Sequence, residues 1–475
     1  MKLTPEEKKQ REIQKWEHEK AKPKGKGYTL YFLFLIGLIY LCDEVVSQIG
    51  GQMQSVIASQ IFAPIVGEKF AVARMSAYGT LTAVAAGLAI LYKPLSDRFG
   101  RHPFLFINTV GMGIACIVIS LSTNIPVYLI GTAISAFFTP HDMQAVYIQE
   151  CAPPEHRARW YSSIKAVATL GMLMIPALRS VFIPDGNLSN WRMVYMLPGL
   201  ITVAAGIASF FLIRESDAFV DNRLKQLRMT PEEIEAAKRN KQDVQAKGGL
   251  IHAVKYVFRN KQVRWLTIAG GFIMAGMLIT SYYETIMTYG YAQQYLDAGM
   301  DLESAKASAS VLVTKALMLF GVGSALFQFF PGFLADAIGR KKTAVVMTGA
   351  LLASFLIFYF GSANAINPYV IGFFCGAAVG GYWYTGDLVA LMVTESTPTN
   401  LRVSTTTAVN SLSGNMYMFA MIGVMILTNI MGDAAIGKCV LYVTVPAMAI
   451  GLLILMFKVK ETKGIDLSTI DGANN

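Results

Sequence analysis

The sequence predicts an all-α membrane protein, with twelve transmembrane helices in two six-helix bundles. The first observation is composition, because 54% of the 475 residues are hydrophobic and only 15% are charged, whereas soluble proteins carry about 25% charged residues. The second is a series of apolar runs, each near the roughly 20 residues that cross a bilayer. We expect helices there, because a segment surrounded by lipid must satisfy its own backbone hydrogen bonds.

The twelve predicted spans are separated by short polar segments, with one long exception. They cover 28–50, 72–93, 103–122, 126–149, 161–183, 192–213, 265–289, 309–335, 343–361, 367–394, 405–430 and 436–458. The long polar segment divides them into six and six. The predicted organisation is an N-terminal tail over 1–27, a first bundle over 28–213, a linker with a short helix over 214–264, a second bundle over 265–458 and a C-terminal tail over 459–475.

Loop charge predicts the orientation in the membrane. Residues 1–27 hold nine lysines and arginines and 214–264 hold twelve, while 123–125 and 362–366 hold none. Lysine and arginine accumulate in cytoplasmic loops, so we expect both termini in the cytoplasm and the protein in the plasma (cell) membrane. The same distribution explains the net charge of +10 without a nucleic-acid partner. The charged first 27 residues also differ from a secretory signal peptide.

Two polar stretches resemble helix starts. "LTPEEKKQREIQKW" begins at Thr4 in the tail, and "RMTPEEIEAAKRNK" contains Thr230 in the linker. In the second, Thr230 can cap the helix, Pro231 occupies its first position and Glu233 completes a capping box. We expect two short cytoplasmic helices, with either a solvated polar face or a contact with the membrane surface.

Spaced residues recur in the two halves at offsets of 239 or 245. The matched pairs are Asp97 and Asp336, Gly100 and Gly339, Arg101 and Arg340, Asp142 and Asp387, Glu150 and Glu395, and Arg157 and Arg402. Because these residues recur in the same order at the cytoplasmic ends of corresponding spans, the halves are predicted to be structural repeats.

The repeated charges lie at the cytoplasmic ends of spans, where arginines can pair with Glu150 and Glu395. Such pairs would form when that face is closed and break when it opens, so we predict a cytoplasmic gate. Its members are Asp97, Arg98, Arg101, Glu150, Arg157, Asp336, Arg340, Glu395 and Arg402. The alternative is that these cations only anchor the orientation.

The combination of motifs resembles the major facilitator superfamily. "DRFGR" follows the second span, "DAIGR" follows the eighth, and "TESTPTNLR" and "KETKGIDLSTID" are similar to the sugar-porter and organic-ion branches. The resemblance covers about residues 28–465. Lys93 and Lys460 stand where the family motifs usually have glycine and proline. The resemblance implies alternating access of one central site to the two sides of the membrane.

Acidic residues inside the spans are the predicted proton-coupling groups. A charge near the bilayer centre costs about 2.5–3.5 kcal/mol on insertion scales, so each needs a reason. Asp43 and Glu44 lie near the middle of the first span, and Glu284 on span seven lies 240 residues after Glu44. Asp142 on span four completes the set. The alternative for Asp43 and Glu44 is a structural ion pair with a buried cation, and the alternative for Glu284 is a position near the outer end of its span, by the aromatic belt.

Polar, aromatic and basic residues in the spans form the predicted solute site. They are Gln48, Gln52, His141, Arg179, Tyr283, Lys315, Tyr382, Trp383, Asp387, Asn410 and Asn415. Lys315 is predicted to be the deepest cation and to bind an anionic group. Arg179 either binds a carboxylate or extends its charged end to the membrane surface.

These observations predict a monomeric secondary transporter that couples a small polar organic solute to protons. Buried acids with a buried lysine favour an organic anion or zwitterion. A sugar or polyol symporter is the alternative, and a multidrug efflux antiporter is the second alternative. No Walker A, H-E-x-x-H or G-x-S-x-G motif occurs, so we expect no enzyme activity, cofactor or metal site. The five cysteines have no C-x-x-C spacing and are predicted to be core residues.

Overall fold

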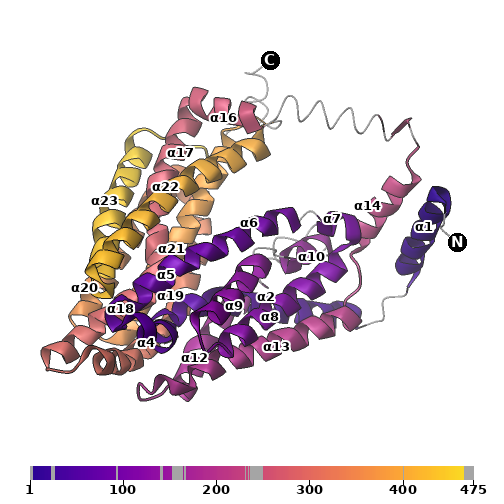
Figure 1. Cartoon of the computed structure of the whole chain (residues 1–475). Coiled ribbons are helices and arrows are strands. Elements are labelled where there is room, and N and C mark those ends of the chain that lie inside the picture. Colours follow the sequence, from indigo (N-terminus) through magenta and orange to yellow (C-terminus); the bar gives the residue numbers. More distant parts are fainter. Residues whose placement is uncertain are drawn as a thin grey trace. The chain divides into compact units, whose positions relative to one another are not determined.

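The computed structural model describes residues 4–22, 27–92, 95–139, 143–151, 164, 167–230, 232–233, 235, 250–398 and 401–464. These residues form helices, turns and short irregular connections, and no strand occurs among them (Figure 1). The chain divides into two compact units. The first comprises Met1–Gly50, Ala77–Phe182 and Ser189–Ala237, and the second comprises Gly51–Ser76, Ile183–Leu188 and Lys238–Asn475.

Helices of the first unit cover the predicted spans one to six, except for the outer segments that belong to the second unit. They are α1 (Pro5–Ala21), α2 (Tyr28–Gln52), η3 (Thr80–Thr82), α6 (Ala83–Tyr92), α7 (Leu95–Phe99), α8 (Arg101–Ser120), α9 (Ile125–Phe138), α10 (Met143–Cys151), η5 (Leu170–Leu173), α12 (Met174–Phe182), α13 (Trp191–Leu212) and α14 (Asp217–Arg228). The short η6 (Leu188–Asn190) precedes α13.

Helices of the second unit cover spans seven to twelve and the segment that continues α2. The continuing segment contains α3 (Gln54–Ile57), the π-helix η1 (Ala58–Phe62), α4 (Ala63–Val66), η2 (Glu68–Phe70) and the start of α5 (Ala71–Gly79). The others are α16 (Leu250–Arg259), α17 (Lys261–Ile273), η7 (Met274–Gly276), α18 (Met277–Asp297), α19 (Leu302–Ile338), α20 (Arg340–Ala363), α21 (Pro368–Glu395), α22 (Arg402–Met431), η8 (Asp433–Ala435) and α23 (Ile436–Phe457).

Side-chain caps begin many of these helices where the sequence supplies an oxygen. The capping box predicted at Thr4 is confirmed, with reciprocal bonds between Thr4 and Glu7. Asn124, Asn260 and Asp301 accept backbone N–H bonds at the starts of α9, α17 and α19. Each cap satisfies donors that the first helical turn leaves without an intrahelical acceptor.

The long helices are apolar enough to cross a membrane. Eight helices among the described residues meet this test by length and composition, and Gln54–Val66, Ile125–Phe138 and Val167–Phe182 are shorter apolar helices. Helix α2, which covers the first span, ends at Gln52: Met53 leaves the helical conformation, and a π-helix begins five residues later. Such π-helical turns are rare and often occur near functional sites.

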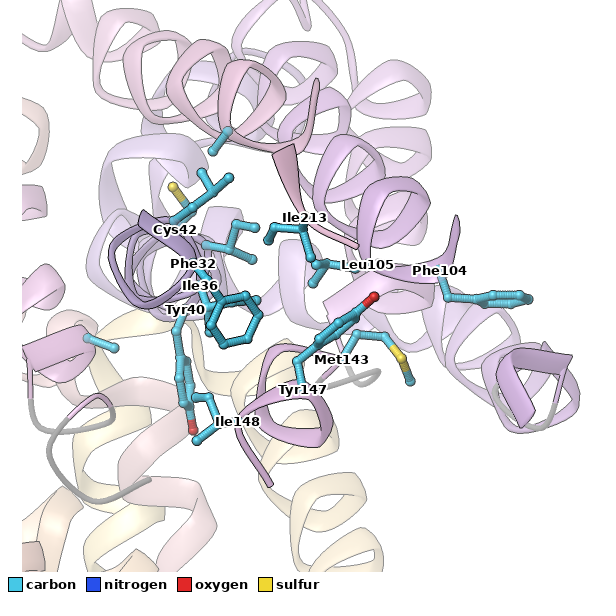
Figure 2. Close-up of a cluster of buried hydrophobic side chains, with 14 of the residues drawn as sticks. Phe32, Ile36, Tyr40, Cys42, Phe104, Leu105, Met143, Tyr147, Ile148 and Ile213 are labelled. Carbon is cyan, nitrogen blue, oxygen red and sulfur yellow. The ribbon is translucent and has the colours of Figure 1, made fainter. Parts of the chain in front are cut away.

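Apolar side chains from α2, α8 and α10 form a core in the first unit. Figure 2 shows Phe32, Ile36, Leu105 and Tyr147 gathered there. The Tyr147 ring is fully buried, and its hydroxyl donates to the Arg214 carbonyl oxygen at 3.1 Å. This packing fixes α2 and α10 against the segment that follows α13. The cysteines predicted to be core residues are buried at four of five positions, namely Cys42, Cys116, Cys375 and Cys439.

Small residues allow α19 and α21 to approach closely in the second unit. Gly372, Gly376 and Gly380 recur every four residues and face the backbone of α19. A Cβ at Gly376 would overlap the Phe320 carbonyl oxygen. This small-residue stripe is a typical means of packing membrane helices.

The linker contains a helix that the sequence analysis did not identify. Helix α14 begins at Asp217 and packs along α1 (Figure 1). Trp16 packs edge-on against Phe219, with ring centroids 5.4 Å apart, and Arg223 pairs with Glu12 at 2.7 Å. The tail helix therefore presents a face to the protein, whereas we expected solvent or the membrane surface. The capping bonds predicted between Thr230 and Glu233 are present.

Candidate functional site

Asp43 is held inside the first unit by a neutral donor. It lies on α2 with only 6% of its surface exposed, and the Gln144 side-chain amide of α10 donates to its Oδ2 at 2.9 Å. The adjacent Glu44 is half-buried. Asp43 and Glu44 therefore have different environments, as adjacent positions on a helix should.

A cavity of about 280 Å³ lies in the first unit beside the stripe that continues from Asp43. Ser47 and Gly50 of α2 form part of its wall, one and two turns beyond Asp43. The remaining lining residues are Val46, Ile49, Cys116, Ile119, Tyr128, Thr132, Ser135, Ala136, Thr139 and Tyr195. The lining thus combines apolar groups with several hydroxyls and includes no acidic or basic side chain among the described residues. Such a surface can bind a small uncharged polar molecule.

Glu284 is a buried acid of the second unit. Only 1% of its surface is exposed, and its Oε2 accepts the backbone N–H of Ser55 at 2.8 Å. The interruption at Met53 begins a new helical segment at Gln54, so the Ser55 N–H lies in a first helical turn. A carboxylate at such a position is favoured by the helix dipole.

Side chains next to Glu284 contact the helical segment that begins at Gln54 and helix α19. Thr285 donates to the Gln54 side-chain oxygen at 2.7 Å. Tyr283 is buried and stacks on Phe320, with centroids 4.8 Å apart and planes 6° apart. Gln52 is fully buried and Gln48 half-buried.

An ion pair that the sequence analysis missed lies near Glu284. The Lys306 Nζ of α19 is 2.5 Å from Glu68 Oε2, and their side chains are 3% and 19% exposed. Ser59 donates to the same carboxylate at 3.1 Å. Lys306 and Glu284 also line one small polar cavity together with Ser55. The sequence signal was weak, because both charges lie just outside the predicted spans.

Asp433 caps a helix that is distant in sequence. Its two carboxylate oxygens accept the backbone N–H groups of Val72 and Ala73 at 2.7 and 2.8 Å. These donors lie in the first turn of α5, where no intrahelical acceptor is available. Tyr289 donates to Asp433 at 3.4 Å. Asp433 therefore fixes the start of α5, a role that the sequence analysis did not assign.

The repeated motifs form a matching polar cluster in each unit. Arg101 lies 3.2 Å from Glu150, and Arg340 lies 3.4 Å from Glu395, so both predicted pairs are present. Gly100 and Gly339 precede the arginines with φ of 111° and 105°, a region that favours glycine. Arg340 also pairs with Asp336 at 2.7 Å.

Two further acids complete these clusters and were missed. Glu215 accepts the backbone N–H groups of Arg101 and His102 at the start of α8, and Glu461 accepts those of Arg340 and Lys341 at the start of α20. The neighbouring hydroxyls, on Ser216 and Thr462, donate to Glu150 and Glu395 respectively. The signal available was the similarity of "RES" at 214–216 to "KET" at 460–462.

The two missed acids have opposite pKa shifts. Burial raises the pKa of Glu215 above its ordinary value, although three backbone N–H groups oppose this. At Glu461 burial also acts to raise the pKa, but four backbone N–H groups, led by that of Lys463, lower it overall. The difference follows the greater burial of Glu215, because desolvation penalises the charged form.

Lys315 is exposed on α19, so the buried lysine that we expected does not lie at this position, and its binding of an anionic group stays a prediction. The buried lysine of that helix is Lys306, nine residues earlier and on another face. Arg179, by contrast, is fully buried, so its charged end does not extend to the surface of the unit. Arg402 donates to the carbonyl oxygens of Thr394 and Thr397 at the end of α21. The carboxyl end of a helix carries a partial negative charge, so it favours a cation at this position.

Other predicted residues have mixed surroundings. Tyr382 is buried, with its hydroxyl 3.0 Å from the Met274 sulfur. Exposed positions are Trp383, Asp387, Asn410 and Asn415. His141, Asp142 and Arg157 lie outside the described residues, as do the side chains of Asp97 and Arg98.

Comparison with known proteins places these features in a family. The model of the Major Facilitator Superfamily matches residues 45–421. The chain is 25% identical over 405 residues to a putative metabolite transport protein of Haemophilus influenzae, covering 80% of this chain and 84% of the relative. It is 22% identical to the glucose transporter GlcP of Staphylococcus epidermidis, covering 56% of this chain and 58% of GlcP.

Solved structures share the fold. The D-xylose-proton symporter has a TM-score of 0.59 at 16% identity, over 92% of this chain and 99% of that protein. The inward-open xylose transporter XylE of E. coli has a TM-score of 0.60 at 16% identity, over 94% of this chain and all of that one. These comparisons confirm the predicted fold of twelve helices in two six-helix bundles. The chain belongs to the major facilitator superfamily and is a multi-pass membrane transporter, not an enzyme.

Proposed function

We propose that this protein is a proton-coupled symporter of a small polar organic solute that works by alternating access. The observation that carries the proposal is the pair of buried carboxylates, Asp43 and Glu284, bonded by amide N–H donors. A neutral donor can bond a carboxylate oxygen or the carbonyl oxygen of a protonated carboxyl group. A proton can therefore enter or leave while these hydrogen bonds persist.

Burial makes these acids sensitive to a change of access. A carboxylate removed from water is disfavoured relative to its protonated form. A conformation that opens the site to water on one side would release the proton, and closure would favour its uptake. We propose Asp43 and Glu284 for this role, with Glu44 and Asp142 retained as predictions.

A neutral polyhydroxyl solute is now the favoured substrate class. The sequence favoured an organic anion because it assigned a buried lysine at position 315, and Lys315 is exposed. The fully buried Arg179 is the cation that would favour an anion instead. The cavity next to Ser47 has a largely apolar wall with several hydroxyl groups and, among the described residues, no charged side chain. GlcP and the arabinose-proton symporter of Bacillus subtilis are among the relatives, which supports sugars or polyols. Organic anions and zwitterions are the second class to test.

The remaining predictions form part of the proposal. We propose cytoplasmic termini, a plasma-membrane location, a monomer and the bundle boundaries given above. The Arg101–Glu150 and Arg340–Glu395 clusters are proposed to close the cytoplasmic side. In each, one arginine binds the acid at the end of another helix, so separating the helices would break the pair.

Uptake into proteoliposomes tests the function. The full-length protein would be supplied with radiolabelled hexoses, pentoses, polyols, organic anions and zwitterions, with and without an imposed inward proton gradient. We expect gradient-dependent uptake of at least one neutral polyhydroxyl solute. Uptake of such a solute that is indifferent to the gradient would refute proton coupling, and uptake of anions alone would refute the substrate class.

Variants of the two acids refine the test. Asp43→Asn and Glu284→Gln preserve shape and remove the titrating group, while Glu303→Gln makes the same kind of change at an exposed position outside the predicted sites. We expect a loss of gradient-driven uptake of at least tenfold in one of the first two variants, with solute exchange retained. Full gradient-driven uptake in both would assign these acids to structure.

A further inference from the structure

A groove of about 480 Å³ lies in the first unit between the tail helix α1 and the ends of α8 and α13. Its wall combines basic and aromatic side chains. The lining residues are Lys15, Trp16, Glu19, Lys22, Phe99, His102, Pro103, Phe210, Phe211, Ile213, Arg214 and Glu215.

The position of the groove is at a membrane boundary. Helix α8 begins there and α13 ends there, and both are long and apolar enough to cross the bilayer. Phe99, Phe210 and Phe211 are 55%, 46% and 76% exposed. Aromatic side chains in this position can contact lipid acyl chains next to the headgroup region.

Basic groups dominate the other part of the groove. Lys15, Lys22 and Arg214 contribute three permanent positive charges, and His102 adds a titratable ring. The two acids in the lining are already engaged by donors of the protein. Glu19 pairs with Lys22 at 2.5 Å, so a phosphate bound there would share Lys22 with Glu19, and Glu215 accepts the N–H groups at the start of α8. The groove therefore has an excess of positive charge.

Trp16 provides an independent indication of a ligand. It is only 5% exposed, and its indole Nε1 has no hydrogen-bond acceptor among the described residues. A buried donor without an acceptor is unfavourable, so the position favours a molecule that supplies an oxygen. Because Trp16 lines the groove, an acceptor bound there is well placed to reach it.

We propose that this groove binds the headgroup of an anionic phospholipid. The phosphate contacts Lys15, Lys22 and Arg214, the acyl chains lie against Phe210 and Phe211, and a headgroup or ester oxygen accepts from Trp16. Arginine suits phosphate through its planar set of donors. The bound lipid joins α1 to the bundle, because α1 forms one wall of the groove and α8 and α13 form the other.

Native mass spectrometry of the delipidated full-length protein tests the site. The probes are phosphatidylglycerol, phosphatidylcholine with the same acyl chains, and inorganic phosphate. We expect a tightly retained phosphatidylglycerol, weaker phosphatidylcholine binding and no displacement by millimolar phosphate. Lys15→Gln with Lys22→Gln removes two charges near the surface, each worth about 1 kcal/mol toward anionic lipid. The affinity of the groove for phosphatidylglycerol should therefore fall about 30-fold.

The matched control is Lys8→Gln with Lys9→Gln, which removes the same charge from exposed positions of α1 outside the groove. Unchanged phosphatidylglycerol affinity in this control would support specific binding in the groove. An equal loss of affinity would show that the positive charge of the surface in general, and not the groove, attracts the lipid. Trp16→Phe keeps an aromatic ring against Phe219 and should still weaken binding severalfold. Equal binding of phosphatidylcholine, or displacement by free phosphate, would overturn the proposal.

Discussion

Breaking the ion pair between Lys306 and Glu68 should destabilise the folded protein more than removing both charges. The Lys306 ammonium is almost completely buried, 2.5 Å from the carboxylate. Glu68→Gln would leave that ammonium without its anionic partner in a poorly solvated position. Lys306→Met with Glu68→Gln removes both charges and keeps similar volume at the lysine.

The surroundings set the expected magnitude. Removing one partner of a buried pair costs about 3–5 kcal/mol, whereas replacing the pair by uncharged groups is often neutral. Glu68 is 19% exposed, and Lys306 also lies 5.5 Å from the Tyr289 ring centroid, which provides a residual cation–π contact. We therefore expect about 3 kcal/mol for Glu68→Gln, at the lower end of that range.

Unfolding of the detergent-purified protein provides the assay. Wild type, Glu68→Gln, Lys306→Met and the double variant would be compared. Glu303→Gln, which removes an exposed acid from the helix of Lys306, is the control. The double variant should recover most of the stability lost in Glu68→Gln. A double variant whose loss equals the sum of the single losses, or a Glu68→Gln variant as stable as wild type, would refute the reasoning.

Three further predictions concern other contacts. Gly376→Leu should lower the unfolding temperature and the yield of folded protein, because its side chain would overlap the Phe320 carbonyl oxygen; a normal unfolding temperature would contradict the close packing. Asp433→Ala should cost about 1–2 kcal/mol as a lost helix cap, with Asn recovering part of this in the same unfolding assay. The pKa of Glu215 in the folded state is raised above its ordinary value of 4.5. Its contribution to the free energy of unfolding is therefore full below pH 4.5 and falls as the pH rises from 4.5 through the raised pKa. The pKa of Glu461 is lowered, so its contribution to the free energy of unfolding is present above pH 4.5 and is lost at lower pH. Glu461→Gln should therefore destabilise the protein at pH 7, and Glu215→Gln should not. Identical dependence of unfolding on pH in the two variants would contradict this.

Local sequence patterns were sufficient to predict the helices and the contacts of the repeated loops. All twelve predicted spans fall on helices within the described residues, and the box at Thr4 is present. The repeat also placed Arg101 near Glu150 and Arg340 near Glu395. These features depend on residues close in sequence or on similar segments that fold in the same way.

Several polar contacts could not be predicted in this way. Glu284 bonds Ser55 across 229 positions because the helix that begins at Tyr28 ends before Met53, and nothing in the local sequence indicates that Glu284 lies beside this end. Lys306 and Lys315 lie on the same apolar helix, yet the first is buried and the second exposed. The helical period gives the faces of α19 but does not indicate which face a neighbouring helix covers.

The sequence by itself determined that this chain forms membrane-spanning helices in two repeated halves, because backbone hydrogen bonding in lipid and loop chemistry are local requirements. Only the tertiary structure decided which charged groups meet. Glu68 joins Lys306, and Asp433 joins the start of α5, across 238 and about 360 residues. Such contacts depend on which faces of distant helices pack together, and the free energy of that packing is a property of both partners.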